Sequence, residues 1–414
     1  MVLDRTAHQR ALLFATFALV VGQWAVPAAA QSSTAEESRF FELPADYEPI
    51  GLNLGKVRVY PDLNLLLEHD SNIYALPENE KDDRIFYLIP RIRAELDSGA
   101  WQFRGLARAQ VRRFVEFESE NSTSGIVEGF ARWSPREGET VRGLASWQRV
   151  VEDRGDPEAN DVPDRGPRRL NLFRSELGYR RDSGTWLLTV TGQANRIDYL
   201  AAADADRDHN SYAGQASIGR QVGGLTFATL TVFAINRDFD EVDLLGVDRD
   251  ATTYGARGGI VINPGGIVFG EASVGVFRFD PSDDVIDSYT GMSLSGNISY
   301  RPTQRTTLHL EAFRGNVATY RAGAVARTDT RVQLTAQQEI RHNFYGRAAV
   351  FMRNTDYRGN RESQRTIGTE GELEYFINRN VGVTFGARYA KRSSDNEFEE
   401  FTRFRALAGV RLYY

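Results

Sequence analysis

The stretch that decides the fold is Phe404-Arg-Ala-Leu-Ala-Gly-Val-Arg-Leu-Tyr-Tyr414. Every second position from Phe404 to Tyr414 is apolar or aromatic, and Arg405 and Arg411 lie between them. Successive side chains of a strand point to opposite faces, so this segment has one apolar face and one polar face. The pattern is typical of the closing strand of a transmembrane β-barrel, although a half-buried strand of a soluble protein alternates in the same way.

The same period of two recurs along the chain. It is clearest at 86–97, 185–195, 331–339 and 381–389. These runs match the roughly 9–11 residues that a tilted strand needs to cross a bilayer. The whole chain, and not only its last segment, therefore indicates membrane strands.

Short turns alternate with longer polar segments. The eight turns, rich in Gly, Pro, Asn and Asp, are Asp97–Gly99, Pro135–Gly138, Asp182–Gly184, Gly223–Gly224, Asn263–Gly266, Arg301–Gln304, Arg341–Phe344 and Asn378–Asn380. The nine longer segments are Asp70–Asp83, Glu116–Ser124, Glu152–Arg168, Ala201–Asn210, Arg237–Asp250, Asp280–Asp287, Gly315–Arg327, Asp356–Gln364 and Lys391–Glu400. Seventeen connections predict eighteen strands, with short periplasmic turns and longer extracellular loops.

Two other all-β folds fit this pattern less well. A β-propeller blade holds four short strands, whereas each repeat here holds two long ones. A soluble sandwich would need more breaks and a larger core than one face of these strands supplies. We therefore predict a transmembrane antiparallel up-and-down β-barrel.

The N-terminal residues have the pattern of a secretory signal peptide. Arg5, His8 and Arg10 precede an apolar run at 11–21, and a small-residue site follows at 26–30. A retained anchor is the alternative. We predict cleavage after Ala30 and export to the outer membrane of a Gram-negative bacterium.

This prediction divides the chain into three parts. Residues 1–30 are the signal peptide, 31–55 a periplasmic N-terminal segment and 56–414 the barrel. The N-terminal segment is too short and too polar to form a plug domain.

Composition excludes several classes. The chain has no cysteine, which excludes disulfides and thiolate sites. Its mean hydropathy is −0.42, and no later stretch is long and apolar enough for a membrane helix. A net charge of −6 without a basic cluster argues against nucleic-acid binding. Outer-membrane lipid, lipopolysaccharide and the barrel-assembly machinery are the partners that a barrel requires.

Aromatic residues lie close to the short turns. Rings at headgroup level form girdles around membrane barrels. The predicted periplasmic girdle is Trp101, Trp133, Tyr179, Trp186, Tyr300, Tyr345 and Tyr375, with Phe227 and Tyr414 beside it. General enrichment of aromatics in strands is the alternative explanation.

A family resemblance rests on residues 47–90. The motifs are Tyr47-Glu-Pro-Ile-Gly-Leu-Asn-Leu-Gly55, Val59-Tyr-Pro-Asp-Leu63, Asp70-Ser-Asn-Ile-Tyr74, Asp82-Asp-Arg-Ile85 and Pro90. This segment resembles the putative β-barrel porin type 2 family of outer-membrane proteins. The resemblance implies a role beside surface (exo- or capsular) polysaccharide synthesis and export, with polysaccharide export components as partners. It implies no catalytic residue and no cofactor.

Charged residues on the polar face of the strands are the candidate lining of the lumen. The basic candidates are Arg91, Arg93, Arg104, Arg108, Arg112, Arg142, Arg388, Arg403 and Arg405, and the acidic ones are Glu339, Glu370, Glu372 and Glu374. Opposed basic and acidic walls would create a transverse field that selects solutes. Alternatively, the charges pair with one another and only make the wall rigid.

Catalytic and metal sites were considered and set aside. His309 and Glu311 share a strand face and could orient a base, but no G-x-S-x-G elbow accompanies them. The acidic loops at 204–208 and 280–287 lack the calcium-loop spacing. We predict no enzyme activity and no metal site, and a lumenal hydrolase stays a distant alternative.

The sequence thus predicts a porin-like channel or export accessory, and a non-conducting structural or assembly barrel is the alternative. We expect an open but constricted pore lined by Arg93, Arg108, Arg142, Glu372 and Arg405. The segment Glu152–Arg168 is the longest candidate to fold inward. The expected assembly signal is Phe404, Val410, Leu412 and Tyr414.

Overall fold

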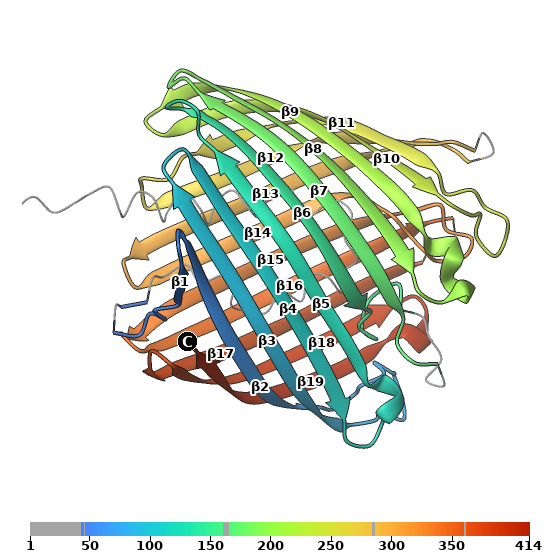
Figure 1. Ribbon diagram of the computed structural model, residues 1–414. Helices are drawn as coiled ribbons and strands as arrows, with labels where there is room; N and C mark the ends of the chain where they lie inside the picture. The colour runs from blue at the N-terminus through green and yellow to red at the C-terminus, as the bar shows by residue number, and fades with distance from the viewer. Residues whose placement is uncertain (1–42, 45, 160–164, 284–285, 360–361) are drawn as a thin grey trace, which may run out of the picture.

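The computed structural model describes residues 43–44, 46–159, 165–283, 286–359 and 362–414. Within them, eighteen antiparallel strands, β2 to β19, form a closed barrel (Figure 1). The strands are β2 (Val57–Asp70), β3 (Asp83–Ser98), β4 (Trp101–Phe114), β5 (Ser122–Trp133), β6 (Glu139–Val151), β7 (Arg169–Asp182), β8 (Trp186–Tyr199), β9 (His209–Gly223), β10 (Thr226–Phe239), β11 (Ala251–Ile262), β12 (Val268–Pro281), β13 (Tyr289–Thr303), β14 (Thr306–Val317), β15 (Ala326–Arg341), β16 (Phe344–Arg358), β17 (Ser363–Asn378), β18 (Val381–Ser394) and β19 (Phe401–Tyr413). Short 3-10 turns lie at Glu118–Glu120, Ala202–Arg207 and Glu397–Glu399. The predicted fold class and strand number are confirmed.

The barrel closes between its first and last long strands. β19 pairs with β2 from Tyr413 opposite Asp62 to Arg405 opposite Asp70. Closure removes the two free edges that an open sheet would expose to lipid.

An additional short strand, β1 (Leu52–Leu54), lies at the seam. It pairs with the start of β2, and the Gly51 backbone nitrogen donates to the Tyr414 carbonyl oxygen at 3.2 Å. This hairpin is the described part of the expected N-terminal segment. The expected signal peptide, residues 1–30, lies outside the described residues.

The connections follow the predicted alternation of eight short and nine longer ones. Gly99 and Gly184 adopt φ values of 64° and 80° in two of the short turns, which side chains with a Cβ rarely do. Several loops are shorter than predicted, because the flanking strands extend into them. β14 continues to Val317 and β15 begins at Ala326, β16 continues to Arg358 and β17 begins at Ser363, and β18 continues to Ser394.

The two faces of the wall differ in character. Phe86, Leu88 and Ile92 of β3 are 55%, 43% and 51% exposed on the outer face. The alternating Ile89 and Arg91 are buried on the inner face. A continuous outer band of exposed apolar side chains is the surface that lipid covers. Among the described residues, no helix is long and apolar enough to cross a membrane.

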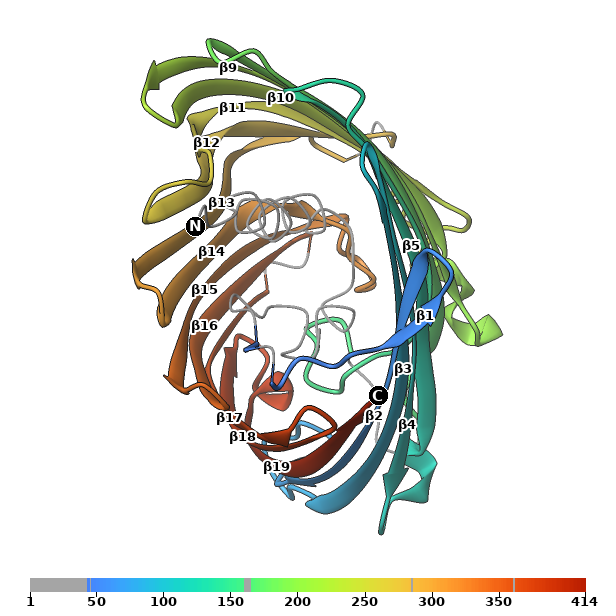
Figure 2. The same ribbon diagram turned by 60° about the vertical axis from the view of Figure 1, so that its left-hand side comes forward.

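Part of the inner wall is apolar. Phe233, Ile235, Phe277 and Phe279 form a cluster on β10 and β12 with Ala251 and Ala326. Inward glycines create the space for these rings, because a Cβ on Gly255 would lie 2.7 Å from the ring of Phe233. The barrel is drawn out rather than round in Figure 2. The buried members of this cluster lie on the inner face of β10, β11, β12 and β15.

Candidate functional site

The connection between β6 and β7 is called here the 152–168 loop, and its described residues 152–159 fold into the barrel (Figure 2). Asp153 lies 2.8 Å from Arg403, and Glu158 lies 2.6 Å from Arg327. Asp156 lies 3.8 Å from Arg353. These arginines belong to β19, β15 and β16, on the far side of the closed sheet. Residues 153–158 therefore reach across the lumen, whereas Arg165 and Arg168 stay on the near side and bind Asp204.

Glu158 is the most enclosed contact of this loop. Its carboxylate accepts from the Thr319 hydroxyl at 3.1 Å and from the Tyr320 backbone nitrogen at 2.9 Å. Its side chain is 4% exposed and that of its partner Arg327 is 2% exposed. Charges removed from water to this extent need both a counter-ion and further hydrogen bonds. Glu158 has both, which fixes the loop to the wall.

Main-chain atoms of the loop are held as well. The Tyr357 hydroxyl donates to the Pro157 carbonyl oxygen at 3.0 Å. Arg392 donates to the Gly155 carbonyl oxygen. The loop is thus anchored by its backbone and by its side chains.

A second loop, residues 318–325 between β14 and β15, crosses in the opposite direction. Ala318 and Tyr320 join a buried cluster with Val150, Leu170, Leu172, Ile197, Tyr199 and Phe239 of β6, β7, β8 and β10. The Tyr320 ring lies 5.7 Å from the Tyr199 ring and 5.7 Å from the His209 ring. The two loops meet at Glu158, so both lie inside the long-loop end of the barrel.

The base of the 152–168 loop carries two carboxylates with different environments. Burial raises the pKa of Glu152 to about 7, although Arg207 and Arg168 lie 3.9 Å away and the Tyr199 hydroxyl donates to it at 2.5 Å. Burial also opposes ionisation of Asp153, but Arg403 and Arg405 outweigh it and hold the pKa of that carboxyl well below its usual range.

The predicted lumen-lining residues lie at inner-face positions of their strands. Those on β3, β4 and β6 are Arg91, Arg93, Arg104, Arg108, Arg112 and Arg142, and those on β15 and β17 to β19 are Glu339, Glu370, Glu372, Glu374, Arg388, Arg403 and Arg405. The two groups are separated by the β19–β2 seam and do not face each other as fully opposed walls. This differs from the expectation because closure places β17 to β19 near β2 to β4 in the sheet.

Many of these charges have partners within their own part of the wall. Asp62 lies 2.8 Å from Arg91, and Glu176 lies 3.0 Å from Arg142. Glu370 lies 3.1 Å from Arg347, and Glu374 lies 2.7 Å from Arg411. Glu339 lies at the short-turn rim, 3.0 Å from His342. These charged residues therefore line the lumen and also form ion pairs with other residues of the wall.

Sequence reasoning missed several residues that hold the loop. Arg327, Asp329, Arg353 and Arg392 all occupy inner-face positions that the alternation could have identified. Asp329, fully buried, lies 2.6 Å from Arg331 and 2.8 Å from Arg353. No sequence pattern indicates which loop residue each arginine contacts, because those pairs lie far apart in the chain.

Most of the predicted girdle lies on the outer face. Trp101 and Trp133 are cross-strand neighbours whose rings stack at 5.4 Å, and both are exposed. Trp186, Tyr300 and Tyr375 are also exposed on that face, and Tyr179 is half-buried there.

Tyr345 and Phe227 are corrections to this set. Tyr345 pairs with Glu374 and packs on the buried ring of Phe376 at 6.0 Å, so it lies on the inner face. Its neighbour Phe344 takes the outer position, 6.2 Å from Tyr375. Phe227 is 2% exposed on the inner face. Each was misplaced because nearness to a turn does not reveal which face of the strand a residue occupies.

The assembly-signal residues lie together along the seam. Phe404, Val410, Leu412 and Tyr414 are 44%, 39%, 40% and 61% exposed on the outer face of the last strand and its end. Tyr413 points inward, and its hydroxyl lies 3.3 Å from Glu374.

The arrangement around His309 does not favour hydrolysis. The Ser299 hydroxyl lies 2.9 Å from His309 Nδ1, and Glu311 lies 3.5 Å from Nε2. Ser299 is only 2% exposed, so a substrate carbonyl would not reach its oxygen. In the acidic segment 204–208, Asp204 accepts from Arg165 and Arg168. Among the described residues no group of three or more His, Cys, Asp or Glu is placed to hold a metal ion.

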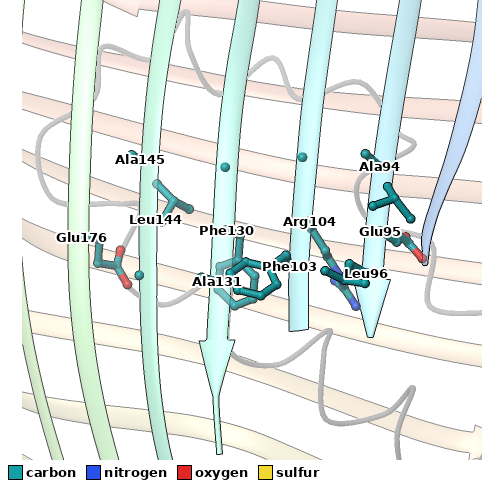
Figure 3. A pocket seen from close by; sticks show the side chains of 14 residues that line it. Ala94, Glu95, Leu96, Phe103, Arg104, Phe130, Ala131, Leu144, Ala145 and Glu176 are labelled. Carbon is teal, nitrogen blue, oxygen red and sulfur yellow. The ribbon is translucent and has the colours of Figure 1, made fainter. Parts of the chain in front are cut away.

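A shallow pocket crosses β3 to β7 (Figure 3). On the outer face, Ala94, Gly105, Gly129 and Ala145 pair in sequence across four strands. Two of these residues are glycines and two are alanines, so no large side chain fills this part of the outer surface. The depression therefore belongs to the lipid-facing surface.

The chain is similar to several solved structures. The OccK2 (OpdF) structure from Pseudomonas aeruginosa has a TM-score of 0.46 and 12% identity, covering 87% of this chain and 98% of its own. A ferric enterobactin receptor (PfeA) mutant from Pseudomonas aeruginosa has a TM-score of 0.42 and 8% identity, covering 86% and 80%. The siderophore receptor PirA from Acinetobacter baumannii has a TM-score of 0.43 and 8% identity, with the same coverage. No curated protein matches the chain.

A family model matches residues 44–414, which is the barrel together with the β1 hairpin. Its description is "Putative beta-barrel porin 2". The chain therefore belongs to the beta-barrel porin 2 family and is a porin-like β-barrel of the outer membrane.

Proposed function

We propose that this protein is a constricted diffusion channel that takes part in the export of surface polysaccharide. The observation that carries the channel proposal is the 152–168 loop, which crosses the lumen and is fixed to the opposite wall by Asp153 and Glu158. Barrels with about 16–18 strands leave an aqueous interior unless a loop or domain fills it. A fixed inward loop narrows such an interior and makes it selective.

The exposure of inner-face residues supports an off-centre path. Arg104 of β4 is exposed, and Arg108 and Arg112 are half-buried. By contrast, Thr253 of β11 and Ser293 of β13 are at most 2% exposed. The open path therefore runs along the inner face of β4, while the apolar cluster on β10 and β12 is packed.

Planar-bilayer recording tests the channel proposal. Folded protein should give discrete conductance steps. Glu158→Ala should raise the step size, because it removes the carboxylate that fixes the loop to Arg327. Glu137→Ala, an exposed residue of a short turn at the opposite rim, is the matched control and should leave the step size unchanged. Folded protein that never conducts would overturn the proposal.

A non-conducting structural barrel is the second candidate. The buried cluster around Tyr320 favours it, because apolar packing inside the long-loop end resembles a plug more than a water-filled pore. Silent bilayers with both Glu158→Ala and the unaltered protein would support this candidate.

The polysaccharide role rests on the family resemblance at residues 47–90. Deletion of the gene should reduce the polysaccharide released to the cell surface, and the unaltered gene on a plasmid should restore it. Normal surface polysaccharide in the deletion strain would reject this part of the proposal. Glycosyltransferase and polysaccharide export genes next to this gene would support it.

The mature chain is proposed to begin near Gln31. N-terminal sequencing of protein from isolated outer membranes tests this, and an uncleaved N-terminus would overturn it.

A further inference from the structure

Four pairs of arginines lie directly opposite each other on neighbouring strands of the inner wall. They are Arg91 with Arg108, Arg132 with Arg142, Arg331 with Arg353, and Arg388 with Arg405. Like charges at directly opposed positions destabilise a sheet unless something neutralises them. Each pair therefore needs an anion nearby.

Three of these pairs have a close carboxylate from the barrel wall. Asp62 lies 2.8 Å from Arg91, and Glu176 lies 3.0 Å from Arg142. Asp329 serves both Arg331 and Arg353, at 2.6 and 2.8 Å. At least one arginine of each of these pairs therefore has a counter-ion within the wall.

The fourth pair differs. Glu370 lies opposite Arg388 on β17, but its carboxylate is 3.1 Å from Arg347, and no carboxylate of the described chain lies within 4.0 Å of Arg388. The Arg388 Nε has no hydrogen-bond partner among the described residues. Arg405 has Asp153 of the 152–168 loop, at 3.4 Å. Asp153 also binds Arg403 more closely, at 2.8 Å, and accepts from the Gly155 backbone nitrogen. One carboxylate is thus shared among several cations.

The guanidinium of Arg388 is held in place. It stacks on the Phe351 ring at 4.9 Å, which orients it without neutralising its charge. Both arginines are half-buried on the inner face, and Arg405 contacts the loop that narrows the lumen. A planar guanidinium donates in a fork that matches the two oxygens of a carboxylate.

We propose that Arg388 and Arg405 form a binding subsite at the constriction for the carboxylate of a permeating sugar acid. The subsite rests on the proposed channel, because the solute must reach the constriction. The bound carboxylate takes the place that Asp62, Glu176 and Asp329 fill at the other three pairs. Uncharged sugars of the same size should not bind at this subsite, because they carry no carboxylate.

Two measurements on the folded, full-length protein test the subsite. Saturation-transfer NMR in lipid nanodiscs reports binding of gluconate, with glucose as the neutral probe and inorganic phosphate as the alternative anion. Block of the single-channel current by gluconate reports the same site in the permeation path. Gluconate should bind and block, and glucose should do neither.

Variants that remove an arginine and the variant that removes Asp153 should change gluconate binding in opposite directions. Arg388→Gln and Arg405→Gln should each weaken gluconate binding about tenfold or more, the loss expected for a charge-assisted hydrogen bond. Asp153→Asn should strengthen it, because Arg405 loses its competing carboxylate. Arg365→Gln, an exposed arginine on the outer face of β17, removes the same charge and should change nothing.

The outcomes separate the subsite from the channel. Gluconate binding that depends on Arg388 in a protein that does not conduct keeps the subsite and rejects the channel. Conduction with gluconate binding equal in Arg388→Gln, Arg405→Gln and Arg365→Gln overturns the subsite. Preference for phosphate over gluconate at the same arginines overturns the assignment to a carboxylate.

Discussion

At the scale of single residues, the ion pair of Glu158 and Arg327 carries the most weight. Both side chains are almost completely buried, and Glu158 accepts from Thr319, Tyr320 and Arg327 together. A buried pair of this kind contributes little net stability compared with an apolar pair of the same volume. Removal of one partner alone is costly, because the other charge stays buried without compensation.

We therefore expect Arg327→Met to lower the free energy of unfolding by about 3–5 kcal/mol. The double variant Glu158→Met with Arg327→Met should recover most of this loss, since no charge is left uncompensated. Reversible urea unfolding in lipid vesicles, followed by tryptophan fluorescence, measures both variants. A double variant that is less stable than the single one would contradict the buried-pair explanation.

At the scale of elements, the 152–168 loop has a carboxylate that titrates near neutral pH. Burial raises the pKa of Glu152 to about 7, above its unfolded value near 4.5. The folded loop therefore binds the proton more tightly than the unfolded loop does. The stability that protonation supplies is fully present below about pH 4.5 and is lost as the pH rises through about 7.

Hydrogen exchange of the loop measures this dependence. After correction for intrinsic exchange rates, protection of 152–159 should fall between pH 6 and pH 8, roughly one unit on either side of the raised pKa. Glu152→Gln should remove the fall, because the amide does not titrate. A pH-dependent fall that persists in Glu152→Gln would assign it to another group.

The last strand has two adjacent tyrosines with different partners. Tyr413 points inward, with its hydroxyl near Arg411 and Glu374, whereas Tyr414 is 61% exposed on the outer face. Deletion of both should strongly lower the folded, heat-modifiable population seen on gels. Tyr414→Ala should reproduce most of that loss and Tyr413→Phe little of it, if the outward ring is the assembly signal. Wild-type yield from the truncated chain would reject the signal.

At the scale of the whole molecule, the alternation and the turn spacing were enough to predict an 18-strand barrel. Both follow from local rules, namely the period of two and the backbone preferences of turn residues. The inward course of the 152–168 loop was expected from its length alone. Its partners were not, because the contact of Glu158 with Arg327 joins residues 169 positions apart, and nothing in local sequence encodes it. Tyr345 was misplaced for the same reason, since its face depends on the register with β17.

The arginines on the inner face of β3, β4 and β6 are expected to influence the ion selectivity of the channel. Replacement of Arg93, Arg108 and Arg142 with Glu should shift the ion selectivity towards cations, because the fixed charge of the lumen changes sign. Reversal potentials in a salt gradient measure the shift. Unchanged selectivity would mean that these arginines do not face the permeation path. The shift should shrink at high salt, since mobile ions screen fixed charges.

The short hairpin of β1 also affects how the chain behaves before the barrel exists. β2 gains its permanent partner β19 only after the last strand has been made, so one edge of β2 is open throughout transit of the chain. β1 pairs with residues that follow it within a few positions, and a hairpin forms in about 1–10 μs. It can therefore shield the start of β2 from other nascent chains long before closure. β1 covers only Val57 to Val59 of that edge. We expect loss of β1 to leave these residues open as well, which would first appear as aggregation in the periplasm.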